Sequence, residues 1–540
     1  MKLKLFTLPL VCALLAGAPL APVSAQDALQ NLIPDNAAGV VYVKSLGELQ
    51  GEIQKLANMF QEGMGDEVDI QSLMMFLGLD DLLDMSKPAA LAIGMPEDDM
   101  APPSMVLILP FKDAEAAVES VNSTGQFDSD AVARGSFVAF APEGSFKPGS
   151  KPCALLQGMP KTDVAIRMNL EAMIANYKDM IAAGMEEASE ELMREMSREG
   201  PGAEAMGKMM IQFMRDAVAS ARMLDITLNV EGTGVDMGAA ITVADGSPMA
   251  TGLKMGSQSL HALAARLPSS HPMAMMMSLD MEGLLQFLMP TYEAMAEDMP
   301  EEFGAAFKEM MSVNLEMAKA LGDDIAWSMG VGSKGIEMAQ AFTAKDPEAF
   351  IGRWIDMLKM PLFADMGVSP KVGESKTSAS GATMREIAME FDWDVFGQTF
   401  GAPEGAGEEI ESMLEMVFGS RQLKMVIGHV GKTVALTMGG DPSLAAGVSG
   451  GQSGGKGVLA QTLAKAGASP AFVWSMDLRG MMLAAGNLAD RMGMSGEVPD
   501  FGKGPACPVG IYAGRTGLVF RGGMHADVGQ ILEMFGPFMR

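Results

Sequence analysis

Histidine, cysteine and aromatic residues are scarce in this chain. Its 540 residues include 4 His, 3 Cys, 4 Trp and 4 Tyr. The histidines show no H-x-x-x-H or H-E-x-x-H spacing, which excludes a zinc hydrolase of that type. Two cysteines lie beyond the N-terminal leader, Cys153 and Cys507. Either a disulfide between them or two buried thiols remains open, and we favour the thiols.

Basic residues are also few. The chain has 39 Lys and Arg against 68 Asp and Glu, a net charge of −29. This field repels nucleic acid and anionic lipid surfaces, so neither is expected as a partner. No apolar run after the leader is long and free of charge. The longest candidate, residues 273–289, is interrupted by Asp280 and Glu282, so no transmembrane segment is expected in the mature chain.

The first 25 residues have the pattern of a secretory signal. Lys2 and Lys4 precede an apolar stretch at 8–15, and Val23-Ser24-Ala25 forms a small-residue cleavage site. Cys12 lies inside the apolar stretch rather than after it, which argues against lipid anchoring. We therefore expect a signal peptide at 1–25 and an exported protein, periplasmic or extracellular, beginning near Gln26.

Four copies of one pattern follow. Each copy has a strand-like run, a capping residue, helical segments, a hairpin, an Asp and another helix. The capping residues are Ser45, Asn169, Asp280 and Asp477, and the later aspartates are Asp113, Asp245, Asp346 and Asp527. Because Ser, Asn and Asp favour helix N-caps, we interpret both sets as caps rather than active-site groups. A repeat of this kind predicts architecture and not chemistry.

The pattern predicts an α+β protein of two similar halves, residues 26–265 and 266–540, with two repeat units each. A hairpin followed by a helix favours an antiparallel sheet with helices packed on one face. Hairpins are expected at 89–110, 224–243, 325–343, 423–438 and 509–522, with an extra strand at 136–141 and a short helical turn at 79–85. The Gly/Ser-rich run at 447–457 is expected to be a flexible loop.

Methionine is abundant, with 54 residues against 24 Phe. The core should therefore be packed by flexible thioethers more than by rings. One tract, from His271 to Met277, is similar to the Met-rich tracts of copper-handling exported proteins, because thioethers and imidazole suit Cu(I). The tract coincides with a repeated strand, so we favour a core strand over a copper site.

The glycine run supplies two matches to the hydrolase elbow G-x-S-x-G, centred on Ser449 and Ser453. Asp477 or Asp490, and then His525, follow in the order that an α/β-hydrolase requires. A Gly-rich run produces such matches by chance, so we favour a linker. The run also approaches a phosphate-binding loop through Gly450, Gly455 and Lys456, but Gly457 stands where Ser or Thr should bind magnesium.

Acidic pairs occur, among them Asp80-Asp81 and Asp98-Asp99, but none extends into a calcium-binding loop. We therefore assign no catalytic, cofactor-binding or metal-binding residue, and no cofactor is expected.

The stretch from Pro34 to Val43, with Gly39-Val40-Val41-Tyr42-Val43, and the hairpin exits Lys112-Asp113 and Lys345-Asp346 resemble those of uncharacterised secreted bacterial proteins grouped as domains of unknown function. This resemblance implies an exported α+β protein and carries over no functional residue.

We expect a non-enzymatic binding or structural protein that acts through its sheet surfaces or through a groove between its halves. The partner stays open, and the candidates are an apolar small molecule and another envelope protein. One alternative is a carrier of apolar, lipid-like ligands, since Met-rich helices over a sheet can enclose a cavity. The other is a serine hydrolase using Ser449 or Ser453. The carrier alternative depends on whether the helix faces at 170–180 and 281–288 enclose a cavity. We expect them instead to pack against the sheet without one.

Overall fold

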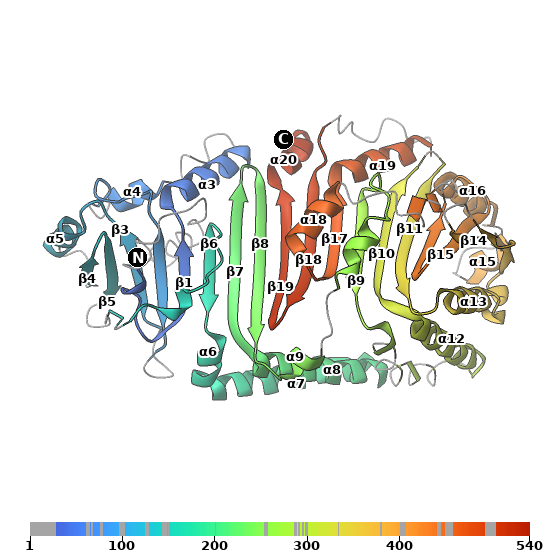
Figure 1. Ribbon diagram of the computed structural model, residues 1–540, viewed down its shortest axis with the longest axis horizontal. Helices are drawn as coiled ribbons and strands as arrows, with labels where there is room; N and C mark the ends of the chain where they lie inside the picture. Colours follow the sequence, from blue (N-terminus) through green and yellow to red (C-terminus); the bar gives the residue numbers. More distant parts are fainter. Residues whose placement is uncertain are drawn as a thin grey trace. The chain divides into compact units, whose positions relative to one another are not determined.

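The fold is taken from a computed structural model and mixes helices with a large antiparallel sheet (Figure 1). The structure describes residues 29–539 apart from 61–64, 66–68, 76–78, 97–102, 125–128, 143–147, 150, 200, 253–256, 284, 286–288, 290–291, 294–295, 297–300, 333, 378–380, 400–404, 406, 440–443, 446, 449–456 and 492–503. The predicted signal peptide lies outside this part of the chain.

The chain forms two compact units. Unit 1 comprises Met1–Ala188, Met214–Gly252 and Gly517–Arg540, and unit 2 comprises Ser189–Phe213 and Leu253–Thr516. Two helices, α7 (Lys178–Glu199) and α8 (Pro201–Ser220), contribute residues to both units.

The strands of unit 1 pair antiparallel in the order β4-β5-β3-β2-β1-β6-β7-β8-β19. Their bounds are β1 (Ala37–Val43), β2 (Ala89–Gly94), β3 (Met105–Pro110), β4 (Ser129–Arg134), β5 (Phe137–Pro142), β6 (Val164–Met168), β7 (Ala221–Glu231), β8 (Gly234–Val243) and β19 (Val519–Asp527). Its helices are α3 (Leu46–Phe60), α4 (Ile70–Met75), α5 (Ala114–Thr124), η2 (Ala154–Leu156), α6 (Leu170–Asn176), α9 (Pro248–Gly252) and α20 (Val528–Met539).

The strands of unit 2 pair antiparallel in the order β18-β17-β9-β10-β11-β16-β15-β14, and β12 and β13 both pair with β14. Their bounds are β9 (Met273–Ser278), β10 (Leu321–Val331), β11 (Ile336–Ala344), β12 (Val368–Val372), β13 (Lys376–Thr377), β14 (Thr383–Phe391), β15 (Leu423–Val430), β16 (Thr433–Met438), β17 (Pro470–Asp477) and β18 (Pro508–Thr516). The helices are α10 (Ser259–Ala264), α12 (Glu301–Ala320), α13 (Pro347–Leu358), α14 (Pro361–Asp365), α15 (Trp393–Thr399), α16 (Gly407–Phe418), α18 (Val458–Ala466) and α19 (Leu478–Arg491).

Apolar residues are buried on both faces of the sheet. In unit 1, Val41 packs in a cluster with Leu46 and Leu49 of α3, while Val40 packs in a second cluster with Leu29 and Leu32. Consecutive residues of a strand point to opposite faces, so β1 is covered on both sides. This corrects the expectation of helices on one face only.

Unit 2 has the same arrangement on β11. Ala341 packs in a cluster that includes Leu263 of α10 and Leu463 of α18, and Phe342 packs in another with Ile351 and Ile355 of α13. The small alanine side chain lets α10 and α18 approach the sheet closely, and Figure 1 shows α18 lying across β17 and β18. The helices again cover both faces of the sheet. The face that carries Ala341 also carries the pocket described below.

The predicted hairpins at 89–110, 224–243, 325–343 and 423–438 are confirmed. The helical turn expected at 79–85 is wrong, because this segment is a turn with an isolated bridge from Leu83 to Phe111. Strands β4, β12, β13 and β14 were not predicted. Of the Gly/Ser-rich run, residues 449–456 lie outside the described residues, whereas Gly447 and Val448 are helical and Val448 is fully buried.

Six of the eight predicted caps accept a hydrogen bond from the helix that they precede. The carboxylate Oδ1 of Asp113, Asp280, Asp346 and Asp527, Oδ1 of Asn169 and Oγ of Ser45 each accept a backbone N–H three residues further on, at 2.9–3.4 Å. The prediction is wrong at Asp245, where Ser247 accepts from the N–H of Ala250 instead. At Asp477, Oδ1 accepts from the N–H of Cys507 at 2.8 Å.

Candidate functional site

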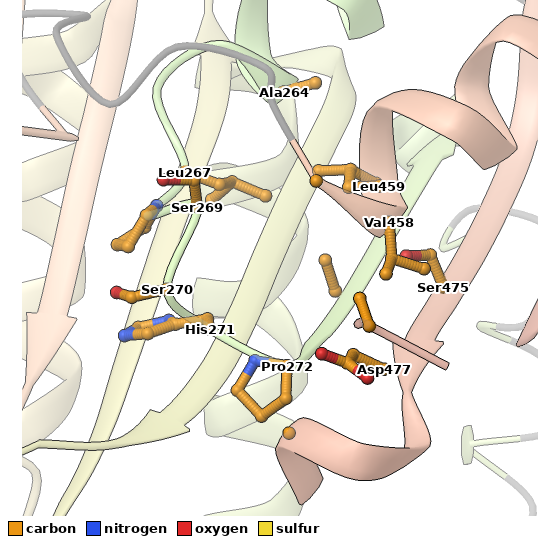
Figure 2. A pocket seen from close by; sticks show the side chains of 15 residues that line it. Ala264, Leu267, Ser269, Ser270, His271, Pro272, Val458, Leu459, Ser475 and Asp477 are labelled. Carbon is orange, nitrogen blue, oxygen red and sulfur yellow. The ribbon is translucent and has the colours of Figure 1, made fainter. Parts of the chain in front are cut away.

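A small pocket in unit 2 lies between the loop that precedes β9 and residues of α18 and β17. Figure 2 shows Ser269, Ser270 and His271 on one side and Val458 and Ser475 on the other. The pocket has a volume of about 150 Å³. That is room for roughly five water molecules and is below the usual size of a site for a drug-sized ligand.

His271 is the titratable group of this pocket with the most unusual surroundings. Its Nδ1 lies 2.9 Å from Oγ of Ser328, and its Nε2 lies 3.7 Å from Oε2 of Glu337. Burial lowers the pKa of His271 from 6.5 to about 4, so the ring is neutral at pH 7. Gly330 lies against the ring, and a Cβ there would come within 2.7 Å of His271 Cδ2.

The order Ser328, His271, Glu337 is that of a serine, a base and an acid. Ser328, however, is 1% exposed in the middle of β10 and does not line the pocket. A nucleophile must reach its substrate, so these three residues form a buried polar contact and not a hydrolase centre. Sequence reasoning missed Ser328 and Glu337, because they lie more than fifty residues from His271 and carry no motif.

Only part of the predicted hydrolase set belongs to the described residues. Ser449 and Ser453 lie outside the described residues. Asp490 is exposed on α19, and His525 is buried on β19. Cys153 is half-buried in unit 1 and Cys507 is buried in unit 2, and burial is the main cause that raises the pKa of Cys153.

A second, larger cavity lies between α12 and the three residues Met289, Tyr292 and Glu293. It has a volume of about 420 Å³ and is half-open to solvent. Met289, Tyr292, Phe307 and Met311 give it an apolar lining, and the Tyr292 and Phe307 rings meet edge to face with centroids 6.2 Å apart. The remaining lining residues are polar, namely Glu293, Lys308 and Ser312. A volume of this size can accept a lipid-like molecule.

The helix faces that were expected to pack on solid sheet do not do so uniformly. No residue of α6 is buried, Tyr177 is half-buried and Met180 is 60% exposed. On the other face, Met281 is half-buried, whereas Leu284 and Leu288 lie outside the described residues. α6 contacts β7 and β1 with its larger apolar side chains half-buried, so the expectation of packing at 170–180 fails clearly only at Met180.

Metal sites built from charged ligands are not found in the described part of the chain, where no three His, Cys, Asp or Glu side chains come together. Among the helices that the structure describes, none has the length and apolar character needed to cross a bilayer. The side chains of the tract from His271 to Met277 lie on opposite faces of the sheet. His271 contacts Ser328, on the same face as the buried Met276, while Met273, Met275 and Met277 point to the opposite face.

Comparison with known proteins adds no name to this geometry: no family model, no curated protein and no solved structure matches the chain.

Proposed function

We propose that this is an exported binding protein for an apolar, lipid-like small molecule, held in the cavity that Met289, Tyr292 and Glu293 form with α12. The observation that carries this proposal is the cavity itself. It combines a volume of about 420 Å³ with thioether and aromatic walls. Ligand sites typically have volumes of about 300–1,000 Å³ and an apolar lining with a few polar groups.

The polar residues give the ligand a direction. Glu293 and Lys308 are exposed, whereas Met311 is buried. An amphipathic molecule would therefore place its chain against Met311 and Phe307 and its head group beside Lys308. Methionine suits such a wall because its unbranched side chain adapts to ligands of different shape.

The test is to purify the full chain without delipidation and to identify extracted molecules by mass spectrometry. Binding of palmitate is then measured for the wild type and for Phe307→Gln. Phe213→Gln is the matched control, because Phe213 is an exposed phenylalanine of α8 outside the cavity.

We expect co-purified lipid in the wild type and in the control, and at least a tenfold loss of palmitate affinity in Phe307→Gln. The absence of extracted lipid together with equal palmitate binding by both variants would contradict the proposal.

We further propose that the exported chain begins near Gln26 and that its halves arose by duplication. The strand pairings support the duplication. Gly39 pairs with Ile93 on one side and Met168 on the other, and Met273 pairs in the same way with Met329 and Met476. N-terminal sequencing of the exported protein tests the first point. An experimental structure in which Ser45 does not superpose on Asp280 would refute the second.

A further inference from the structure

Six methionines lie side by side across six neighbouring strands of unit 2. Each is the direct cross-strand partner of the next, in the order Met476, Met273, Met329, Met338, Met438 and Met425. Directly paired residues of antiparallel strands point to the same face, so the six thioethers form one row, which we call the methionine row. Met425 is buried and the other five are half-buried.

Two tryptophans stand beside one end of this row. In the neighbouring set of paired residues on the same face, Trp474 pairs with Met275 and Met275 pairs with Trp327. These strands, β17, β9 and β10, also carry Met476, Met273 and Met329. Trp474 and Trp327, two of the four tryptophans of the chain, therefore each lie two residues along the strand from a methionine of the row, Met476 and Met329 respectively.

We propose that Met476, Met273 and Met329, with the flanking indoles, form a binding site for a soft monovalent cation, Cu(I). Thioethers are soft ligands that select Cu(I) over the hard and borderline divalent ions. An indole face attracts a cation within about 6 Å, and Trp is the best aromatic group for this contact.

The spacing of the strands allows such coordination. Paired residues of antiparallel strands have Cα atoms about 4.5–5.5 Å apart. A metal–sulfur bond of about 2.3 Å places two ligating sulfurs about 4 Å from each other, and the flexible methionine side chain can make that adjustment. The three methionines are half-buried, so an ion can reach them and is partly shielded from water once bound.

The site differs from the one suggested by the tract at 271–277. His271 and Met276 face the other side of the sheet and take no part. Two of the three thioethers come from β10 and β17, far from β9 in sequence. The proposal is independent of the lipid cavity, because the residues of the two sites do not overlap.

The experiment titrates the full chain with Cu(I) under anaerobic conditions, in competition with the chelator bicinchoninate. Tryptophan fluorescence monitors the binding. The test variant is Met273→Leu/Met329→Leu, which conserves side-chain volume. The control is Met180→Leu/Met413→Leu, which removes two exposed thioethers outside the row. Far-ultraviolet circular dichroism and urea unfolding establish that each variant is folded.

We expect the wild type and the control to hold one Cu(I) against the chelator and to lose tryptophan fluorescence on binding. The test variant should bind at least tenfold more weakly, and Trp327→Phe should reduce the fluorescence change while retaining the ion. Equal Cu(I) affinity in the test variant and the control, or no Cu(I) retained by the folded wild type, would overturn the proposal.

Discussion

Arg167 on β6 and Asp225 on β7 are direct cross-strand partners joined by two hydrogen bonds. Arg167 Nε donates to Oδ1 at 2.6 Å and Nη2 donates to Oδ2 at 2.9 Å. The guanidinium also donates to the backbone carbonyls of Leu155, Gln157 and Gly158. One buried arginine thus connects two strands of the sheet to the segment around η2.

Removing one partner should therefore be costly. Asp225→Ala leaves a buried guanidinium without its counter-charge, and we expect the free energy of unfolding to fall by about 3–5 kcal/mol. Urea unfolding measures the change. The control is Glu204→Gln, which removes the exposed ion pair with Lys208 and should cost less than about 1 kcal/mol. Similar losses in the two variants would contradict this account of Arg167.

The buried imidazole of His271 should make stability depend on pH. Its folded pKa of about 4 lies below 6.5, so the unfolded chain binds more protons between these values. The stabilisation is complete above pH 6.5 and is lost as pH falls towards 4, by about 3 kcal/mol in total. Urea unfolding between pH 4 and 7.5 tests this. His271→Gln should flatten the profile, whereas His261→Gln, at an exposed position, should leave it unchanged.

Two aspartates that occupy corresponding places in the predicted repeat pattern should respond differently to the same substitution. Asp346 caps α13 through the N–H of Ala349 at 3.0 Å. We expect Asp346→Ala to cost about 1 kcal/mol, the usual effect of losing an N-cap. Asp245→Ala should lower the free energy of unfolding by at most a few tenths of a kcal/mol, because Ser247 caps the following helix. Thermal unfolding of both variants checks this, and equal shifts would contradict it.

Methionine oxidation should follow exposure rather than position in the sequence. Met75 and Met180 are 62% and 60% exposed, while Met276 is fully buried. Dilute peroxide should convert the first two to sulfoxides while the chain stays folded, and Met276 should react only in urea. Peptide mass spectrometry after timed exposure gives the rates. Early oxidation of Met276 in the folded protein would show that the core around α10 opens readily.

Features that depend on neighbouring residues were the ones that the sequence predicted well. Caps such as Ser45 and Asp346 need one side chain and one N–H three residues away. Hairpins need two apolar runs and a turn. β4 was missed because Ser129-Asp130 and Arg134 give it the composition of a loop.

The candidate sites depend on contacts that composition does not encode. Arg167 and Asp225 are 58 residues apart, and His271 and Ser328 are 57 apart. The methionine row needs the register of six strands to be known. A one-residue shift in any pair would turn that methionine to the other face.

The pairing of β19 with β8 ties the end of the chain to its first half. The chain is synthesised from its N-terminus, so β8 is made long before its partner at Val519–Asp527. Until then the outer edge of β8 presents unpaired backbone groups that can pair with strands of other chains. The sheet of unit 1 therefore cannot be completed before β19 has been synthesised, and a chain released earlier keeps an unpaired edge at β8.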